Sequence, residues 1–199
     1  MPGSTTLDVA VLVFSRTPVP GRVKTRLVPR LGEWGAARLH ARLTGHALRT
    51  AAAARCGPVE LHDTARQRGA DLGERMHRAL AQTLRHHRGA IVIGADCPAL
   101  RPRDLRRAAR WLSGGCDVVL APAEDGGYAL IAAKRVSPLL FSGVAWGGPD
   151  VYATTVRNLV SLGYRWRALA QVWDVDRPED LERVRWLRFA SAARPSARR

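Results

Sequence analysis

Long apolar runs, a leader-like start and paired cysteines are all missing from this sequence of 199 residues. No run of about 18 apolar residues occurs, which excludes a membrane-spanning helix of ordinary length. Residues 1–8 contain no basic segment followed by an apolar one, so the sequence predicts no secretory signal. We therefore expect a cytoplasmic protein without a membrane span.

Metal-binding and disulfide patterns are also missing. The three cysteines, Cys56, Cys97 and Cys116, are far apart and form no C-x-x-C pair. The six histidines show neither H-x-x-x-H nor H-E-x-x-H spacing. Such a sparse, odd set of cysteines indicates reduced thiols and argues against a structural zinc site.

Lysine and acidic residues are scarce, whereas arginine is abundant. Of the 32 basic residues only Lys24 and Lys134 are lysines, and with 17 acidic residues the formal net charge is +15. This charge attracts small anionic molecules and would also support binding to nucleic acid. However, the arginines are spread over every expected helix and aromatic residues make up only 6% of the chain. Nucleic-acid binding is therefore an alternative that we do not favour, as is a non-catalytic scaffold.

The distribution of apolar residues predicts an α/β fold. Expected strands alternate with expected helices, whose apolar residues recur about every four positions. The strands are expected at 9–14, 59–62, 90–94, 117–121, 128–133 and 164–173, and the helices around 39–51, 72–84, 102–112, 149–162 and 176–187. Such units predict a Rossmann-like, mostly parallel sheet with helices on both faces. We expect one domain over residues 1–190 and a disordered basic tail at 191–199.

The loops that follow the expected strands are the places to look for a site, because ligands of such sheets bind beyond the carboxyl ends of the strands. Residues 15–27 (SRTPVPGRVKTRL) follow the first strand and carry Arg16, Lys24 and Arg26, with Gly21 as a flexible point. Cations at this position can neutralise phosphate oxygens. The loop matches neither a Walker A motif nor G-x-G-x-x-G, and a merely solvated basic loop is the alternative.

A second basic group comes from residues 67–76 (QRGADLGERM). Asp71 and Glu74 have the spacing of a helix-capping box, which is a purely structural explanation of this segment. Gly69 would allow a close backbone contact, and Arg75 is a candidate contact for a nucleotide.

Three acidic loops complete the candidate site. Asp96 follows an apolar strand in GADCPAL, Asp125 precedes two glycines in PAEDGGY, and Asp174 and Asp176 alternate in WDVDRPED. Asp96, Asp174 and Asp176 would form a three-carboxylate cluster, which repels itself unless a cation neutralises it. Since carboxylates suit hard divalent ions, we expect Mg²⁺ or Mn²⁺ there. The alternatives are that Asp96 and Asp176 cap turns or helices and that Asp125 belongs to a tight turn.

Five of these segments occur in an order that resembles one family. PVPGRVKTRL, QRGADLGERM, IGADCPAL, LAPAEDGGYAL and DVDRPEDL are similar to motifs of the bacterial glycosyltransferase-like branch of the GT-A (nucleotide-diphospho-sugar transferase) superfamily, some members of which are linked to arsenosugar biosynthesis. The chain also resembles, more distantly, the 2-phospholactate and phosphoenolpyruvate guanylyltransferases. The resemblance covers residues 9–187, nearly the whole chain.

The resemblance implies a GT-A fold and a role for each matching residue. Lys24 and Arg26 would contact donor phosphates, together with the other nucleotide-binding candidates Arg16, Gly21, Gly69 and Arg75. Asp96 would hold Mg²⁺ or Mn²⁺ with Asp174 or Asp176, and Asp96 and Asp125 would be catalytic. The acceptor side would be formed by Gly126, Gly127, Tyr128 and Trp146.

The expected activity is a metal-dependent transfer of sugar from a nucleotide-sugar to a small-molecule acceptor. The alternative is a guanylyltransferase-like nucleotidyl transfer from a nucleoside triphosphate to a small phosphorylated acid, because the same residues serve both reactions. Two features depart from the family pattern: the segment LHDTAR after the second strand is short, and no hydroxyl residue follows Trp146. Both departures concern the acceptor.

Overall fold

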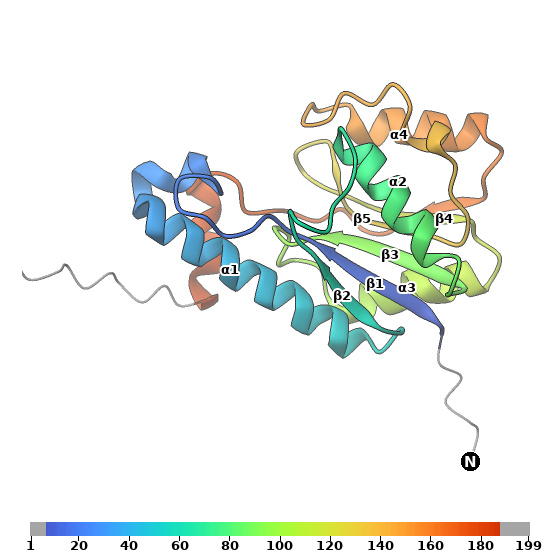
Figure 1. Ribbon diagram of the computed structural model, residues 1–199, viewed down its shortest axis with the longest axis horizontal. Helices are drawn as coiled ribbons and strands as arrows, with labels where there is room; N and C mark the ends of the chain where they lie inside the picture. Colours follow the sequence, from blue (N-terminus) through green and yellow to red (C-terminus); the bar gives the residue numbers. More distant parts are fainter. Residues whose placement is uncertain (1–6, 188–199) are drawn as a thin grey trace, which may run out of the picture.

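The computed structural model describes residues 7–187 of the chain (Figure 1). Its strands are β1 (Val9–Phe14), β2 (Val59–His62), β3 (Gly89–Gly94), β4 (Val118–Pro122), β5 (Tyr128–Ala133) and β6 (Trp166–Ala168). Its α-helices are α1 (Val28–Ala54), α2 (Leu72–Thr83), α3 (Pro102–Ser113) and α4 (Val151–Ser161), and its 3₁₀ helices are η1 (Thr25–Leu27), η2 (Pro138–Phe141) and η3 (Pro178–Leu187). The tail expected at 191–199 lies outside the described residues.

The six strands form one sheet in the order β2-β1-β3-β5-β4-β6. All neighbouring strands pair in parallel except β5, which runs antiparallel to both β3 and β4. Because β5 is reversed, it begins at the edge of the sheet where β1 and β3 end. This confirms the expected mostly parallel sheet and places the turn between β4 and β5 beside the loops that follow β1 and β3.

Helices cover both faces of the sheet, as the apolar pattern predicts. Strand β1 shows why: Val9, Val11 and Val13 face the helices α1 and α3, whereas Leu12 and Phe14 face α2. The strand is buried on both faces, as its uninterrupted apolar sequence predicts. None of the described helices combines the length and the apolar character needed to cross a bilayer.

A third, smaller apolar cluster joins the last described segment to the first half of α1 and the 3₁₀ helix before it. Leu27 and Leu39 pack with Val175 and Val184, and each of the four is fully buried. In Figure 1 the last helical segment, drawn in red, lies beside the blue first half of α1. Burying such side chains is worth about 1.5–3 kcal/mol each, so this cluster holds residues 173–176 against the loop that precedes α1.

Two expected elements differ from the structure near the C-terminal end. The strand expected at 164–173 is paired only over Trp166–Ala168, with one further bridge between Ala123 and Val172. The last helix begins at Pro178 instead of Asp176, as a 3₁₀ helix. The amides of Asp176 and Arg177, which precede it, donate to Asp180 Oδ2. The extended residues before Pro178 are thereby left to run along the edge where the loops gather.

Candidate functional site

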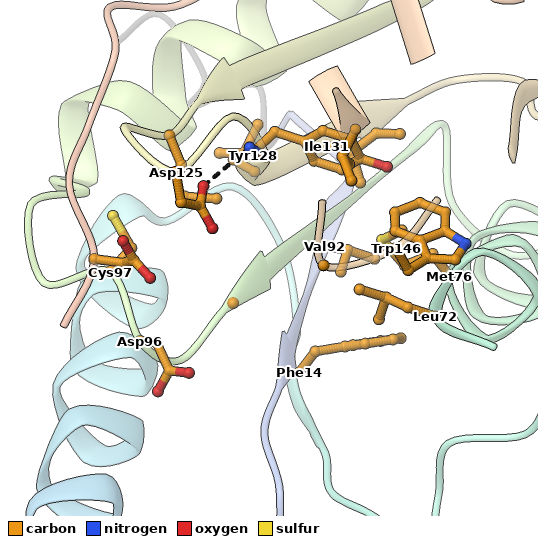
Figure 2. A pocket seen from close by; sticks show the side chains of 18 of the residues that line it. Phe14, Leu72, Met76, Val92, Asp96, Cys97, Asp125, Tyr128, Ile131 and Trp146 are labelled. Atoms are coloured by element: carbon orange, nitrogen blue, oxygen red, sulfur yellow. Dashed lines mark hydrogen bonds between the residues drawn. The ribbon is translucent and has the colours of Figure 1, made fainter. Parts of the chain in front are cut away.

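Two adjoining cavities open where β1 and β3 end and β5 begins. The larger has a volume of about 1080 Å³ and lies among the segments before α1 and α2. The smaller has a volume of about 250 Å³ and lies over β5 and the β4–β5 turn (Figure 2). Phe14, Leu72, Gly94 and Asp96 line both cavities, so Asp96 lies at their boundary.

The larger cavity is basic. It brings together the four basic side chains of the loop that follows β1 and one basic side chain of α2: Arg16, Arg22, Lys24, Arg26 and Arg75. Gly21 and Gly69 are not among its lining residues. Gly21 (φ 73°) packs against the Glu33 carboxylate, and the Gly69 carbonyl accepts a hydrogen bond of 3.1 Å from Arg75 Nε. The two glycines therefore shape the cavity, and a ligand contact of either one stays a prediction.

Lys24 joins three segments that are distant in the sequence. Its Nζ lies 2.9 Å from Asp96 Oδ2 and also donates to the Val175 carbonyl, although its side chain is only 5% exposed. The backbone of Lys24 is in the left-handed region, with φ 49° and ψ 41°. A non-glycine residue in this conformation is uncommon and is found mainly where the surroundings or a function require it.

Asp96 is held in its charged form. Burial works to raise the pKa of this carboxyl group, but His40 and the ammonium of Lys24 outweigh it and keep the pKa below its ordinary value. His40 Nδ1 lies 3.4 Å from Asp96 Oδ1, and Nε2 contacts the Arg16 carbonyl at 2.9 Å and the Ser15 hydroxyl at 3.1 Å. His40 thus links the first loop to Asp96.

Sequence reasoning missed His40. It lies in the middle of α1 and is buried, so it read as part of an ordinary helix. A signal was available: His40 and Thr44 are polar residues next to Leu39 and Leu43 on the same apolar stripe. A polar pair on a buried stripe needs partners, which here lie on the loop after β1.

The segment that carries Asp174 and Asp176 lies along the loop after β3. The Val175 amide donates to the Asp96 carbonyl at 2.9 Å, and Cys97 Sγ donates to the Trp173 carbonyl at 3.0 Å. With Val175 buried between them, Asp174 reaches the smaller cavity and Asp176 the larger one.

The structure does not gather Asp96, Asp174 and Asp176 into one cluster, and a metal ion held by Asp96 with one of the other two stays a prediction. Among residues 7–187 no three histidine, cysteine or acidic side chains lie close enough together to hold a metal ion. Asp176 is paired with Arg26 in the larger cavity, and Asp96 is paired with Lys24. In this structure the side chains that neutralise these carboxylates belong to the protein itself.

The smaller cavity is lined by three carboxylates, although among residues 7–187 they are not close enough together to form a metal cluster. Asp96, Asp125 and Asp174 all line it. Burial, followed by the charge of Asp125, raises the pKa of Asp174 to about 6. Carboxylate oxygens are the donors that a hard divalent cation prefers, and a site for Mg²⁺ or Mn²⁺ at Asp96 and Asp174 stays a prediction.

The β4–β5 turn presents Asp125 to this cavity. Asp125 Oδ1 accepts a hydrogen bond of 2.9 Å from the Gly127 amide, drawn dashed in Figure 2. Gly127 lines the cavity, whereas Gly126, expected on the acceptor side, does not. At Gly126 the backbone has φ 87°, and an added Cβ would lie 2.0 Å from the Pro149 carbonyl oxygen. Gly126 is therefore needed for the close approach of this turn to the start of α4.

Tyr128 and Trp146, both expected on the acceptor side, form one wall of the smaller cavity. Their rings meet edge to face, with centroids 6.4 Å apart. Trp146 packs closely on α2, because a Cβ added at Gly73 would lie 2.6 Å from its ring. The Tyr128 hydroxyl and Trp146 Nε1 are buried without a hydrogen-bond partner among the described residues.

Similar folds occur among solved structures. The chain is similar to a Desulfovibrio desulfuricans G20 protein provisionally described as a nucleotide-diphospho-sugar transferase, with 28% identity, a TM-score of 0.77, and coverage of 96% of this chain and 91% of that one. A nucleotidyl transferase from Methanothermobacter has 14% identity and a TM-score of 0.57, covering 89% of this chain and 95% of that one. CMP:2-keto-3-deoxy-manno-octonic acid synthetase complexed with CTP has 13% identity and a TM-score of 0.53, covering 90% of this chain and 98% of that one. The last two show a shared fold alone.

Sequence families give a further result. No curated protein matches the chain by sequence. Residues 33–148, more than half of the chain, match a family described as an uncharacterized protein conserved in bacteria. That span includes His40, Asp96, Asp125 and Trp146. Lys24 precedes it and Asp174 follows it. The chain belongs to the DUF2064 family.

Proposed function

We propose that this protein is a transferase that binds an activated nucleotide in the larger cavity and transfers a group to a small molecule in the smaller one. The observation that carries the proposal is the pair of adjoining cavities at the carboxyl edge of the sheet, one basic and one acidic, with Asp96 at their boundary. The similar protein provisionally described as a nucleotide-diphospho-sugar transferase supports sugar as the transferred group.

The basic side chains of the larger cavity would hold the diphosphate of the donor. Arg16, Arg26 and Arg75 can each offer a planar pair of donors to phosphate oxygens. Lys24 would supply a point charge close to Asp96, where the reacting bond would lie. Charge that develops on the departing phosphate would then meet cations already in place.

Dependence on Mg²⁺ or Mn²⁺ is part of the proposal. Asp96 would hold the ion together with Asp174, which also lines the smaller cavity, and Asp125 would face the acceptor. Asp176 is paired with Arg26. When bound, such an ion stabilises negative charge on the diphosphate leaving group. The link to arsenosugar biosynthesis stays a prediction.

In the proposed reaction a hydroxyl group of the acceptor attacks C1 of the donor sugar. The bond from C1 to the diphosphate oxygen breaks, and its electron pair leaves with the diphosphate. The acceptor proton would pass to the carboxylate of Asp125, whose Oδ1 is oriented by the Gly127 amide. Asp96 and Lys24 would fix the position of the reacting bond between the two cavities.

Nucleotidyl transfer is the second candidate. In that reaction the acceptor attacks the α-phosphate of a nucleoside triphosphate and pyrophosphate leaves. The volume and the basic lining of the larger cavity suit a triphosphate as well as a nucleotide-sugar. The shared fold of the Methanothermobacter nucleotidyl transferase favours keeping this candidate.

The test is calorimetric titration of the protein with nucleotide-sugars and nucleoside triphosphates, with and without Mn²⁺. We expect at least one of these ligands to bind and Mn²⁺ to strengthen that binding. Asp96→Ala should lose the strengthening by Mn²⁺, whereas Asp150→Ala, an exposed residue at the start of α4, should not. If Asp96→Ala responds to Mn²⁺ as the wild type does, the metal role of Asp96 is wrong. Binding to duplex DNA alone, with no nucleotide binding, would favour the nucleic-acid alternative.

A further inference from the structure

The smaller cavity differs in chemistry from the rest of this basic protein. We propose that it selects an acceptor with an apolar body and a hydroxyl or amine group, and that it excludes carboxylates and phosphorylated acids. An amine could bind as the ammonium ion and would attack after losing a proton to the Asp125 carboxylate. This inference rests on the proposed function, because it names the class of molecule that would receive the transferred group. It also disfavours the small phosphorylated acid expected as an alternative from the sequence.

The body of the cavity is apolar. Its walls come from β1, β3, β5 and α2 and from the segment before α4, and its apolar lining includes Phe14, Leu72, Met76, Val92, Ile131 and Trp146. Figure 2 shows these side chains gathered on one side of the cavity, with Asp96 and Asp125 on the other. A ligand that fills it would therefore bury an apolar portion against aliphatic and aromatic side chains.

The polar end of the cavity carries negative charge only. Asp96, Asp125 and Asp174 line it, and within residues 7–187 no arginine, lysine or histidine does. This contrasts with a chain whose formal net charge is +15 and with the neighbouring cavity, where five cations gather. Asp96 has Lys24 as a partner, but Asp125 accepts only the Gly127 amide among the described residues.

This distribution of charge decides which acceptors can enter. An amine or a hydroxyl group can donate a hydrogen bond to the Asp125 carboxylate. An ionised carboxylate has no proton to donate, and a phosphate carries at least one full negative charge. Either group would face like charge, and no cation among residues 7–187 lines this cavity. A volume of about 250 Å³ limits the acceptor to a small molecule, about the lower end of ordinary ligand pockets.

The experiment compares three probes of similar size in the presence of a chelator: 2-phenylethylamine, 2-phenylethanol and phenylacetate. Binding to the full chain is measured by ligand-observed NMR and by calorimetry, with and without a nucleotide that binds the larger cavity. We expect the amine and the alcohol to bind and phenylacetate to bind at least tenfold more weakly. Equal or tighter binding of phenylacetate would overturn the proposal, and so would failure of all three probes to bind.

Neutral variants locate the effect. Asp125→Asn and Asp174→Asn should weaken binding of the amine and reduce its advantage over phenylacetate by at least threefold. Glu124→Gln is the matched control, since Glu124 is next to Asp125, pairs with Arg183 and does not line the cavity. If Glu124→Gln changes the order of the probes as much as Asp125→Asn does, the selection arises from overall charge and the proposal is wrong.

The same samples separate this inference from the proposed function. If a nucleotide binds and the probes do not follow the expected order, the acceptor class is wrong and the proposed transferase stands. If the probes follow the order and no nucleotide-sugar or triphosphate binds with or without Mn²⁺, the proposed function fails and the selectivity of the smaller cavity is confirmed by itself.

Discussion

The two cavities lie side by side and share four residues, but their surroundings shift the pKa of an aspartate in opposite directions. In the larger cavity and at its boundary, carboxylates meet cations: Asp176 pairs with Arg26 and Asp96 with Lys24. In the smaller cavity Asp174 is partly buried and faces the like charge of Asp125. The pKa of Asp96 is consequently lowered, whereas that of Asp174 is raised to about 6.

The difference shows that net charge describes a protein poorly at the scale of a site. The chain as a whole has a charge of +15, and its basic cavity reflects that excess. The lining of the adjoining smaller cavity is acidic and apolar. A donor rich in phosphate and an acceptor without negative charge could therefore bind to neighbouring surfaces of one small protein.

The largest expected effect is a loss of stability caused by a substitution in the β4–β5 turn beside the smaller cavity. Gly126→Ala would place a Cβ 2.0 Å from the Pro149 carbonyl oxygen at a residue with φ 87°. We expect the free energy of unfolding, measured by urea denaturation, to fall by about 3 kcal/mol. Nucleotide binding should persist under conditions where the variant is folded, because Gly126 is not among the residues that line the larger cavity.

Gly127→Ala is the control for this variant. Its backbone does not have a positive φ, and an added Cβ would lie 3.2 Å from the movable Asp125 carboxylate. We expect a loss below about 1 kcal/mol. Equal stability of Gly126→Ala and the wild type would show that the turn can move away from Pro149.

The next effect concerns the boundary between the cavities. Lys24→Met removes the ammonium that lies 2.9 Å from Asp96 Oδ2 and leaves the Val175 carbonyl without this donor. Breaking a fully buried pair costs about 3–5 kcal/mol. Because the Asp96 side chain is 42% exposed, we expect a smaller loss of about 2 kcal/mol in unfolding free energy.

A double-mutant cycle with Asp96→Asn tests whether the pair acts as a unit. The losses in unfolding free energy of the two single variants, added together, should exceed the loss of the double variant by roughly 1 kcal/mol. The reason is that each single variant leaves the other charged side chain without its partner. Strict additivity of the two losses would mean that Lys24 stabilises the protein through Val175 and its own packing instead of through Asp96.

A more moderate effect separates binding from stability in the larger cavity. Arg26→Gln should weaken nucleotide binding about tenfold, equivalent to about 1.4 kcal/mol, because it removes a charged donor to phosphate. Stability should change by less than about 0.5 kcal/mol, since the Arg26 side chain is 68% exposed.

Arg78→Gln is the matched control for Arg26→Gln. Arg78 is exposed, pairs with Glu74 one helical turn away and lines neither cavity. Isothermal titration with one nucleotide should distinguish the two variants. Equal losses of affinity in both would show that the overall charge, and not this cavity, attracts the nucleotide.

The smallest expected effect is a pH dependence of stability that arises in the smaller cavity. Asp174 ionises near pH 4 when unfolded but only near pH 6 when folded, so the folded state binds more protons between these values. Stability contributed by this group therefore falls as pH rises from 4 to 6 and stays reduced above. In the presence of a chelator, Asp174→Asn should be more stable than wild type by about 1 kcal/mol at pH 7 and similar at pH 4. A difference that is the same at both pH values would contradict the raised pKa.

Much of the fold could be predicted because it depends on local periodicity. The apolar run at 9–14 and the four-residue spacing of Leu39 and Leu43 are properties of adjacent residues, and the structure has the expected strand and helix there. The tight turn expected at residues 125–127 agrees with the antiparallel pairing of β4 and β5. The insertion of β5 between β3 and β4 was not predicted, since long-range packing decides which strands are neighbours in a sheet. The strand expected at 164–173 was overextended, because Leu169 and Val172 pack against the core under α1 and α3, and Trp173 on the cluster around Val175, with only one further bridge to a neighbouring segment.

The sequence by itself determined that cations follow β1 and that carboxylates follow β3 and β4, because the order of strands and loops is a property of the chain. Only the tertiary structure decided which of these charges meet. Lys24 pairs with Asp96, Asp176 pairs with Arg26, and Asp174 lies with Asp125. The physical reason is that the buried cluster around Val175 sets the path of residues 173–176, and a step of two residues along that path moves a carboxylate from one cavity to the other.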